Sequence, residues 1–125
     1  MKLRLELFVE SIEKSVEFYR NVLEFNAPKD TKANYIPVIK GDVVLGLGEM
    51  KNLPDFHPLK VSRNGQQVGL GVEIVLKVED VYDVYNKVVG KGYPIQTDLA
   101  ERPWGMIDFR IIDPDGYYLR ITSSN

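Results

Sequence analysis

The chain has 125 residues, is 44% hydrophobic and 27% charged, and contains no cysteine. That length fits one domain with its own core, and the lack of cysteine excludes disulfides, thiolate catalysis and cysteine-ligated metal centres. A net charge of −2 argues against nucleic acid as a partner, and no apolar run reaches the ~18 residues of a membrane span. The composition therefore predicts a cytoplasmic α+β protein with neither a nucleic-acid nor a membrane partner.

The first half of the chain predicts a strand, a helix and a hairpin. Residues 3–9 alternate apolar and polar side chains with the period of two that strands show. Ser11 is a candidate N-cap for a following amphipathic helix. The apolar positions of that helix are Ile12, Val16, Tyr19 and Leu23. Residues 35–39 and 43–47 are predicted to be strands joined by a tight turn.

The second half repeats this order after a long connection. Residues 49–68 hold prolines, glutamines and isolated apolar residues, and long connections in compact domains are often functional. A strand is predicted over 72–78 and a helix over 81–89. Three further strands are then expected at 93–97, 107–112 and 117–122, with an Asp-Pro-Asp-Gly turn before the last one.

The two halves match as an internal repeat. The first strand of one half aligns with the first strand of the other, so that Leu5 corresponds to Ile74. The helices align in the same way, and the last strands align with Leu45 on Leu119. A matched strand and helix together with a matched final hairpin are improbable by chance, so the chain is predicted to contain two copies of one βαβββ unit.

Two stretches carry a family resemblance: residues 9–23, VESIEKSVEFYRNVL, and residues 102–116, RPWGMIDFRIIDPDG. They resemble the vicinal oxygen chelate superfamily, which includes glyoxalase I, bleomycin resistance proteins, extradiol dioxygenases and fosfomycin resistance proteins. The second stretch is most similar to the bleomycin resistance branch. The resemblance implies an α+β fold of two βαβββ modules whose sheets curl around a shared cavity. It covers one domain, residues 1–125, with module one at about 1–48, the connection at 49–68 and module two at about 69–123.

The same resemblance locates the metal-ligand positions of the superfamily in this chain. In its metal-dependent members the ligands are His, Gln or Glu on the first and last strands of each module. The corresponding positions here are Arg4 and Gly46 in module one, and Glu73 and Arg120 in module two. A guanidinium is protonated at every useful pH and has no lone pair to give, so this set predicts that no metal or other cofactor is bound.

The charges at these positions leave two interpretations open. Glu73 between Arg4 and Arg120, with Glu6 on the same face as Arg4, could be a structural ion-pair cluster that replaces the metal. The arginines also exceed Glu73 by one positive charge, and the surplus guanidinium could hold a ligand carboxylate or phosphate.

Aromatic residues are the remaining candidates for a ligand site. Trp104 lies between proline and glycine before a strand, where a tryptophan can stack on a ligand at a cavity mouth, although core packing is the alternative. Phe56 lies in the long connection. Phe8, Tyr35 and Tyr118 fall on or near the expected cavity faces, but core packing would explain them equally well.

These residues favour a binding protein over an enzyme, because no group of side chains in the sequence could act together in catalysis. No catalytic residue is therefore predicted. The expected function is metal-independent binding of a small, partly aromatic or anionic compound in a cavity at the interface of a homodimer. The two arginines at the cavity make cationic bleomycin itself a poor fit. The alternatives are a metal-dependent lyase, isomerase or dioxygenase of the same superfamily, and an accessory protein whose cavity is filled by its own side chains.

Overall fold

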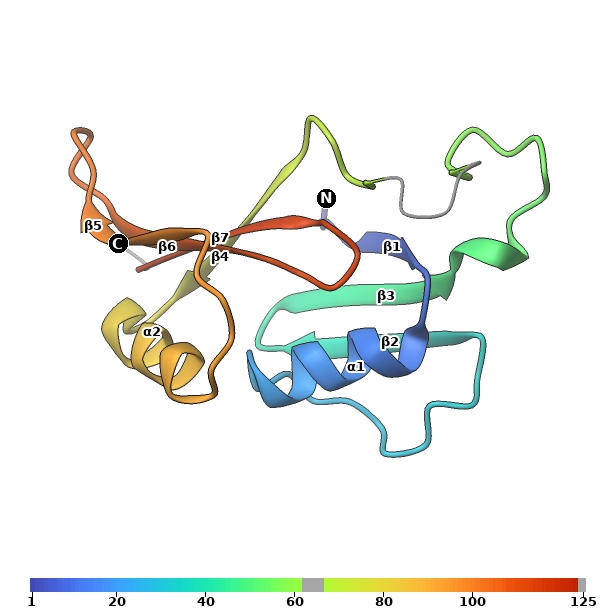
Figure 1. Cartoon of the computed structure of the whole chain (residues 1–125), viewed down its shortest axis with the longest axis horizontal. Coiled ribbons are helices and arrows are strands. Elements are labelled where there is room, and N and C mark those ends of the chain that lie inside the picture. Colours follow the sequence, from blue (N-terminus) through green and yellow to red (C-terminus); the bar gives the residue numbers. More distant parts are fainter. Residues whose placement is uncertain (62–66, 124–125) are drawn as a thin grey trace. The chain divides into compact units, whose positions relative to one another are not determined.

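The computed structural model describes residues 1–61 and 67–123, and the chain divides into two compact units, Met1–Gln66 and Gln67–Asn125. Each unit has one mixed sheet and one α-helix, which confirms the predicted α+β class (Figure 1). Within the described residues, no helix is long and apolar enough to cross a membrane.

The first unit contains a three-stranded sheet and helix α1. Strand β1 (Leu5–Val9) runs parallel to β3 (Val43–Glu49), which pairs antiparallel with β2 (Tyr35–Lys40), so the sheet order is β1-β3-β2. Helix α1 (Ile12–Asn21) begins where predicted, because the Ser11 side chain accepts a hydrogen bond from the Lys14 amide. An isolated bridge between Asn26 and Ile39 extends the sheet beyond β2.

The second unit repeats this arrangement with four full strands. Its sheet order is β4-β7-β6-β5, formed by Glu73–Val78, Tyr118–Ser123, Ile107–Ile112 and Thr97–Glu101. Helix α2 (Val81–Gly90) is capped by the Asp80 side chain, which accepts from the amides of Tyr82 and Asp83. The Asp113 carboxylate accepts hydrogen bonds from three backbone amides in the turn between β6 and β7. Asp113 therefore stabilises the Asp-Pro-Asp-Gly turn that the sequence predicts.

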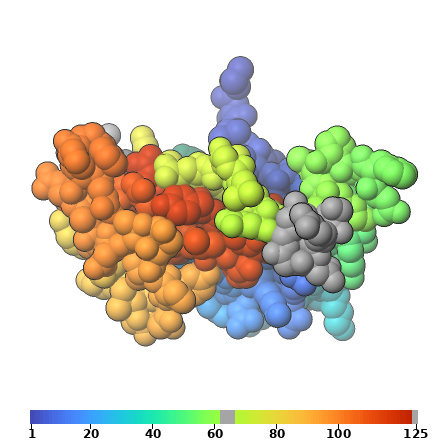
Figure 2. Space-filling view, turned by 45° about the horizontal axis from the view of Figure 1, so that its top comes forward, coloured from blue at the N-terminus to red at the C-terminus, as the bar shows by residue number. Residues whose placement is uncertain are grey.

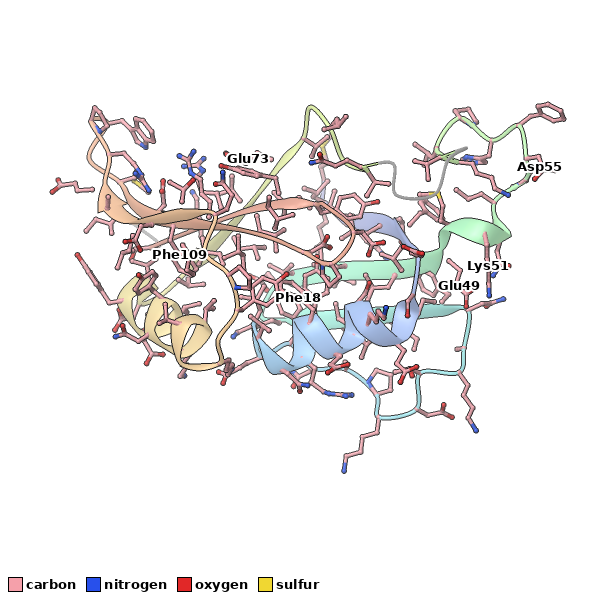
Figure 3. All side chains as sticks on the ribbon, viewed as in Figure 1. Phe18, Glu49, Lys51, Asp55, Glu73 and Phe109 are labelled. Carbon is pink, nitrogen blue, oxygen red and sulfur yellow. The ribbon has the colours of Figure 1, made fainter. Side chains whose placement is uncertain are left out.

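Register confirms that the two units are copies. Leu5 pairs with Leu45 in β1 and β3, and the corresponding Ile74 pairs with Leu119 in β4 and β7. In each unit the face that carries these residues is apolar and packs on the helix, where Phe109 meets Tyr85 of α2 edge-to-face. Figure 3 shows Glu73 on the opposite side of the sheet from Phe109.

One predicted strand is misplaced in the sequence analysis. The strand expected at 93–97 begins only at Thr97, and residues 93–95 precede it without strand pairing. Pro94 has no amide to donate to a ladder, and the Tyr93 hydroxyl instead donates to the Ile112 carbonyl. The pairing of β5 with β6 then shifts register between Thr97 and Ala100. Strand β1 also starts later than predicted, since Leu3 is exposed and precedes it.

The described part of the long connection has a defined local structure. It contains a short 3-10 helix, Met50–Asn52, and a loop that Lys60 holds by donating to the Leu53 carbonyl and to Asp55. Figure 2 shows this green segment as a lobe of the surface. Residues 62–66 of the predicted connection lie outside the described residues.

Candidate functional site: an arginine cluster on the second sheet

The second sheet carries its charged side chains on the face opposite α2. Glu73 of β4, Arg120 of β7, and Asp108 and Arg110 of β6 alternate with the apolar residues that face the helix. Arg102 joins them from the connection between β5 and β6. We call Arg102, Arg110 and Arg120, together with Asp108 and Glu73, the arginine cluster.

Asp108 is the centre of the arginine cluster. Its side chain is 0% exposed, and Oδ1 accepts a hydrogen bond of 2.8 Å from Nε of Arg102. Arg110 lies 3.6 Å from the same oxygen, and Arg120 lies 3.8 Å from Oδ2. A carboxylate removed from water is stable only beside cations and donors, and these three guanidinium groups supply them.

Glu73 pairs with Arg120 as the sequence predicts. Nε of Arg120 donates to Oε1 of Glu73 over 2.8 Å, and the Glu73 side chain remains 38% exposed. Glu73 is therefore a partly solvated partner, whereas Asp108 is the buried carboxylate. Arg4, the second arginine expected near Glu73, has its contacts inside the first unit.

Arg110 is held by an aromatic hydroxyl. Its Nη1 donates to the Tyr118 hydroxyl over 3.5 Å, and that hydroxyl donates in turn to Oε1 of Gln96 over 3.3 Å. The hydrogen bond to Tyr118 and the nearby Asp108 carboxylate raise the pKa of Arg110, against the opposing effect of burial. These neighbours therefore favour the cationic form of Arg110.

The equivalent face of the first unit carries a separate network of side chains, in which Arg4 and Glu6 remain about half exposed. Nε of Arg4 lies 2.7 Å from Oε1 of Glu6, and Arg4 also donates to the Tyr35 hydroxyl. That hydroxyl donates to Glu6 over 3.1 Å, so the three side chains form one network. Tyr35, through its hydrogen bond, and Glu6, through its charge, raise the pKa of Arg4.

Gly46 lies beneath this network. A Cβ added there would overlap Oε2 of Glu6 and the hydroxyl oxygen of Tyr35, and one added at Gly48 would press on the Phe8 ring at 3.2 Å. The glycines of β3 therefore make room for side chains from β1 and β2. This places four of the predicted site residues, Arg4, Glu6, Phe8 and Tyr35, on one face of the first sheet.

Two predicted aromatic residues lie apart from these networks. Phe56 is fully exposed in the long connection, and Trp104 is 60% exposed in the connection between β5 and β6. Sequence reasoning also missed Asp108, Arg102 and Arg110. The period of two in residues 107–112 places Asp108 and Arg110 on the face opposite Phe109, so strand alternation in the sequence would have found both.

The four positions implied for a metal do not fit one. Arg4 and Arg120 offer no lone pair, Gly46 has no side chain, and Oε1 of Glu73 is bound by Arg120. In the parts of the chain that the structure describes, no three His, Asp or Glu side chains gather into a possible metal site. Arginine stands where a divalent cation would need ligands.

A βαββ unit and a βαβββ unit with matching registers define the class of this protein. The family model for the Glyoxalase/Bleomycin resistance protein/Dioxygenase superfamily matches residues 3–121. The chain belongs to this superfamily, and the resemblance seen in the sequence is confirmed.

Solved structures show the same fold at low sequence identity. TioX from Micromonospora sp. ML1 is 18% identical with a TM-score of 0.75, and the match covers 98% of each chain. A virulence protein from Salmonella typhimurium is 26% identical with a TM-score of 0.70, over 100% of this chain and 98% of that one. A lactoylglutathione lyase from Agrobacterium tumefaciens is 15% identical with a TM-score of 0.72, over 99% and 93%. No curated protein matches the chain.

Proposed function

We propose that this protein is a metal-independent binding protein of its superfamily, which sequesters a small, partly aromatic or anionic compound. The observation that carries the proposal is the chemistry at the superfamily's ligand positions. Arginine stands at two of them and glycine at a third, and the one carboxylate, Glu73, is bound to Arg120. Such a set cannot hold a divalent metal but can hold an anion.

We also propose that the protein forms a homodimer in the cytoplasm and binds its ligand in a cavity at the dimer interface. The side chains proposed to contact the ligand combine charged groups and aromatic rings, which fix and cover small molecules in most binding sites. They are Arg4, Glu6, Phe8, Tyr35, Phe56, Glu73, Trp104, Tyr118 and Arg120.

A thermal-shift screen with a parallel metal analysis tests this function. Protein treated with a chelator is screened against a library of small acids, bases and neutral aromatic compounds, with and without Zn²⁺, Mn²⁺, Ni²⁺ and Fe²⁺. We expect at least one compound to raise the Tm without metal, by roughly 5 °C at about ten times its Kd. The metal ions alone should leave the Tm unchanged.

Two results would contradict the proposal. One divalent metal per chain in elemental analysis, or compounds that bind only with metal present, would favour the alternative of a metal-dependent lyase, isomerase or dioxygenase. A library without a single binder would favour the accessory protein.

A further inference from the structure

The arginine cluster carries one more positive charge than negative. Three guanidinium groups face the two carboxylates of Asp108 and Glu73. The Asp98 carboxylate acts on Arg102 only from a distance, because its hydrogen-bond partner is the Tyr85 hydroxyl. The first unit shows no such excess in its network, where Arg4 is matched by Glu6. The two copies of the repeat therefore differ in electrostatic character at corresponding faces.

The hydrogen-bond donors of the three arginines are used unequally. Arg102 makes three hydrogen bonds, two of them to Asp108 and one to the Asp98 carbonyl. Arg120 donates a short hydrogen bond to Glu73. Arg110 makes one long bond of 3.5 Å to Tyr118, and its buried Nε has no hydrogen-bond partner among the described residues. A guanidinium has five N–H donors, and Nε of Arg110 is turned towards Asp108 at 3.6 Å, so the unused donors of Arg110 within the described structure are on its Nη groups.

Strand register adds a repulsion at the same place. Arg110 and Arg120 are direct partners across β6 and β7, and like charges in that position destabilise a sheet unless an anion lies between them. Asp108 screens this repulsion only in part. Its Oδ2 is 3.8 Å from Arg120 and accepts no hydrogen bond within the described structure. Spare donors, an excess charge and a like-charge pair thus coincide at Arg110.

We propose that Arg110, with Arg120 beside it, binds a single carboxylate of the small-molecule ligand. This inference deepens the proposed function and rests on it. The planar fork of a guanidinium matches a carboxylate in a bidentate geometry. A monoanion neutralises the excess charge, whereas a dianion exceeds it and is repelled by Asp108 and Glu73. Tyr118, which contacts Arg110, provides an aromatic ring next to the bound group.

Three simple probes separate charge from shape. Benzoate is a monoanion, benzamide is its neutral analogue, and phenyl phosphate changes from monoanion to dianion near pH 6. Binding is measured by calorimetry, and the Nε–H signal of Arg110 is followed by NMR in the wild type. We expect benzoate to bind at least ten-fold more tightly than benzamide and to shift that signal. Phenyl phosphate should bind more tightly at pH 5 than at pH 8.

Arginine variants locate the binding. Arg110→Gln should weaken benzoate binding at least ten-fold, and Arg110→Lys should weaken it less, because lysine keeps the charge and loses the fork. Arg20→Gln is the control, since Arg20 lies in α1 and bonds to the Pro28 carbonyl. Denaturant unfolding of each variant verifies that it folds. If Arg110→Gln does not fold, the lysine variant and the wild-type NMR signal decide.

The outcomes distinguish this inference from the proposed function. Equal affinity for benzamide and benzoate, or unchanged benzoate binding in Arg110→Gln, overturns the carboxylate site and leaves a small-molecule binding protein. The carboxylate site is also overturned, and the proposed function is kept, if the wild type does not bind benzoate but binds neutral compounds from the library. Binding of no compound at all overturns both.

Discussion

Asp108 and Glu73 are both paired with arginine, but burial makes the loss of each charge cost a different amount. The Asp108 carboxylate is fully buried among three guanidinium groups, so Asp108→Asn leaves buried cations without their partner. We expect this change to lower the free energy of unfolding by roughly 3–5 kcal/mol, measured by urea denaturation.

Glu73→Gln should cost much less. Its side chain is 38% exposed, so water and salt screen the pair with Arg120, and the expected loss is at most about 1 kcal/mol. Glu79→Gln is the matched control, because Glu79 is exposed directly after the same strand. If Glu73→Gln proved as costly as Asp108→Asn, the centre of the arginine cluster would be Glu73.

Tyr93 predicts how stability depends on alkaline pH. Burial, and then the nearby charge of Asp113, raise the pKa of Tyr93 to about 12. An unfolded tyrosine ionises near pH 10, so the folded state holds its proton more tightly. This contribution to stability is complete below about pH 10 and is lost as the pH rises towards 12.

Replacing Tyr93 by Phe removes that dependence. The stability of Tyr93→Phe should fall less than that of the wild type between about pH 10 and 12, as measured by denaturant unfolding at each pH. Absorbance of the phenolate should also show one late-titrating tyrosine fewer in the variant than in the wild type, where Tyr85, through its hydrogen bond to Asp98, has a raised pKa as well. Superimposable curves would mean that Tyr93 is not shielded in the folded protein.

At the level of elements, replacing glycine by alanine is expected to have opposite effects on stability at two positions. Gly46→Ala inserts a Cβ where Glu6 and Tyr35 cross β3, so it must displace the network with Arg4. The expected cost is about 1–3 kcal/mol. Gly90→Ala, at the end of α2, meets nothing within 4 Å and should be neutral or stabilise by up to about 1 kcal/mol. Thermal unfolding of both variants measures the difference, and a Gly46→Ala protein as stable as the wild type would show that the network moves freely.

Elements with strong periodicity could be predicted from the sequence, and weaker ones could not. Residues 107–112 form the strand that their pattern predicts, and Ser11 caps α1. Strand β5 was misplaced because its residues hardly alternate and its pairing contains a register shift. Local sequence does not reveal an irregularity that the partner strand imposes.

The site was predictable to the extent that it follows strand alternation. The family resemblance located Glu73 and Arg120, and the apolar alternation of β4 agrees with the placement of Glu73. The same alternation along β6 reaches Asp108. Arg102 was out of reach, since its contacts depend on how the connection between β5 and β6 turns back. No periodic pattern describes such a turn.

For the whole molecule, we expect a homodimer. Strands β1 and β4 lie at the edges of their own sheets, and β4 carries an exposed Val75 beside Glu73. Edge strands with apolar side chains are usually covered, and closed two-fold pairing is the commonest way to cover them. Light scattering at micromolar concentration should give twice the 14.3 kDa of one chain. A mass of a single chain under these conditions would contradict the expectation.

A repeated fold lets two copies of one backbone framework carry different chemistry. In both units the face that packs on the helix is apolar and keeps the same register, Leu5 with Leu45 and Ile74 with Leu119, whereas the opposite faces differ. At corresponding positions on that face, Gly46 of the first unit lies under the network of Glu6 and Tyr35, and Arg120 of the second unit belongs to the arginine cluster. Substitutions in the arginine cluster should therefore change the charge that the protein offers to a ligand, whereas substitutions at Gly46 are limited by steric fit.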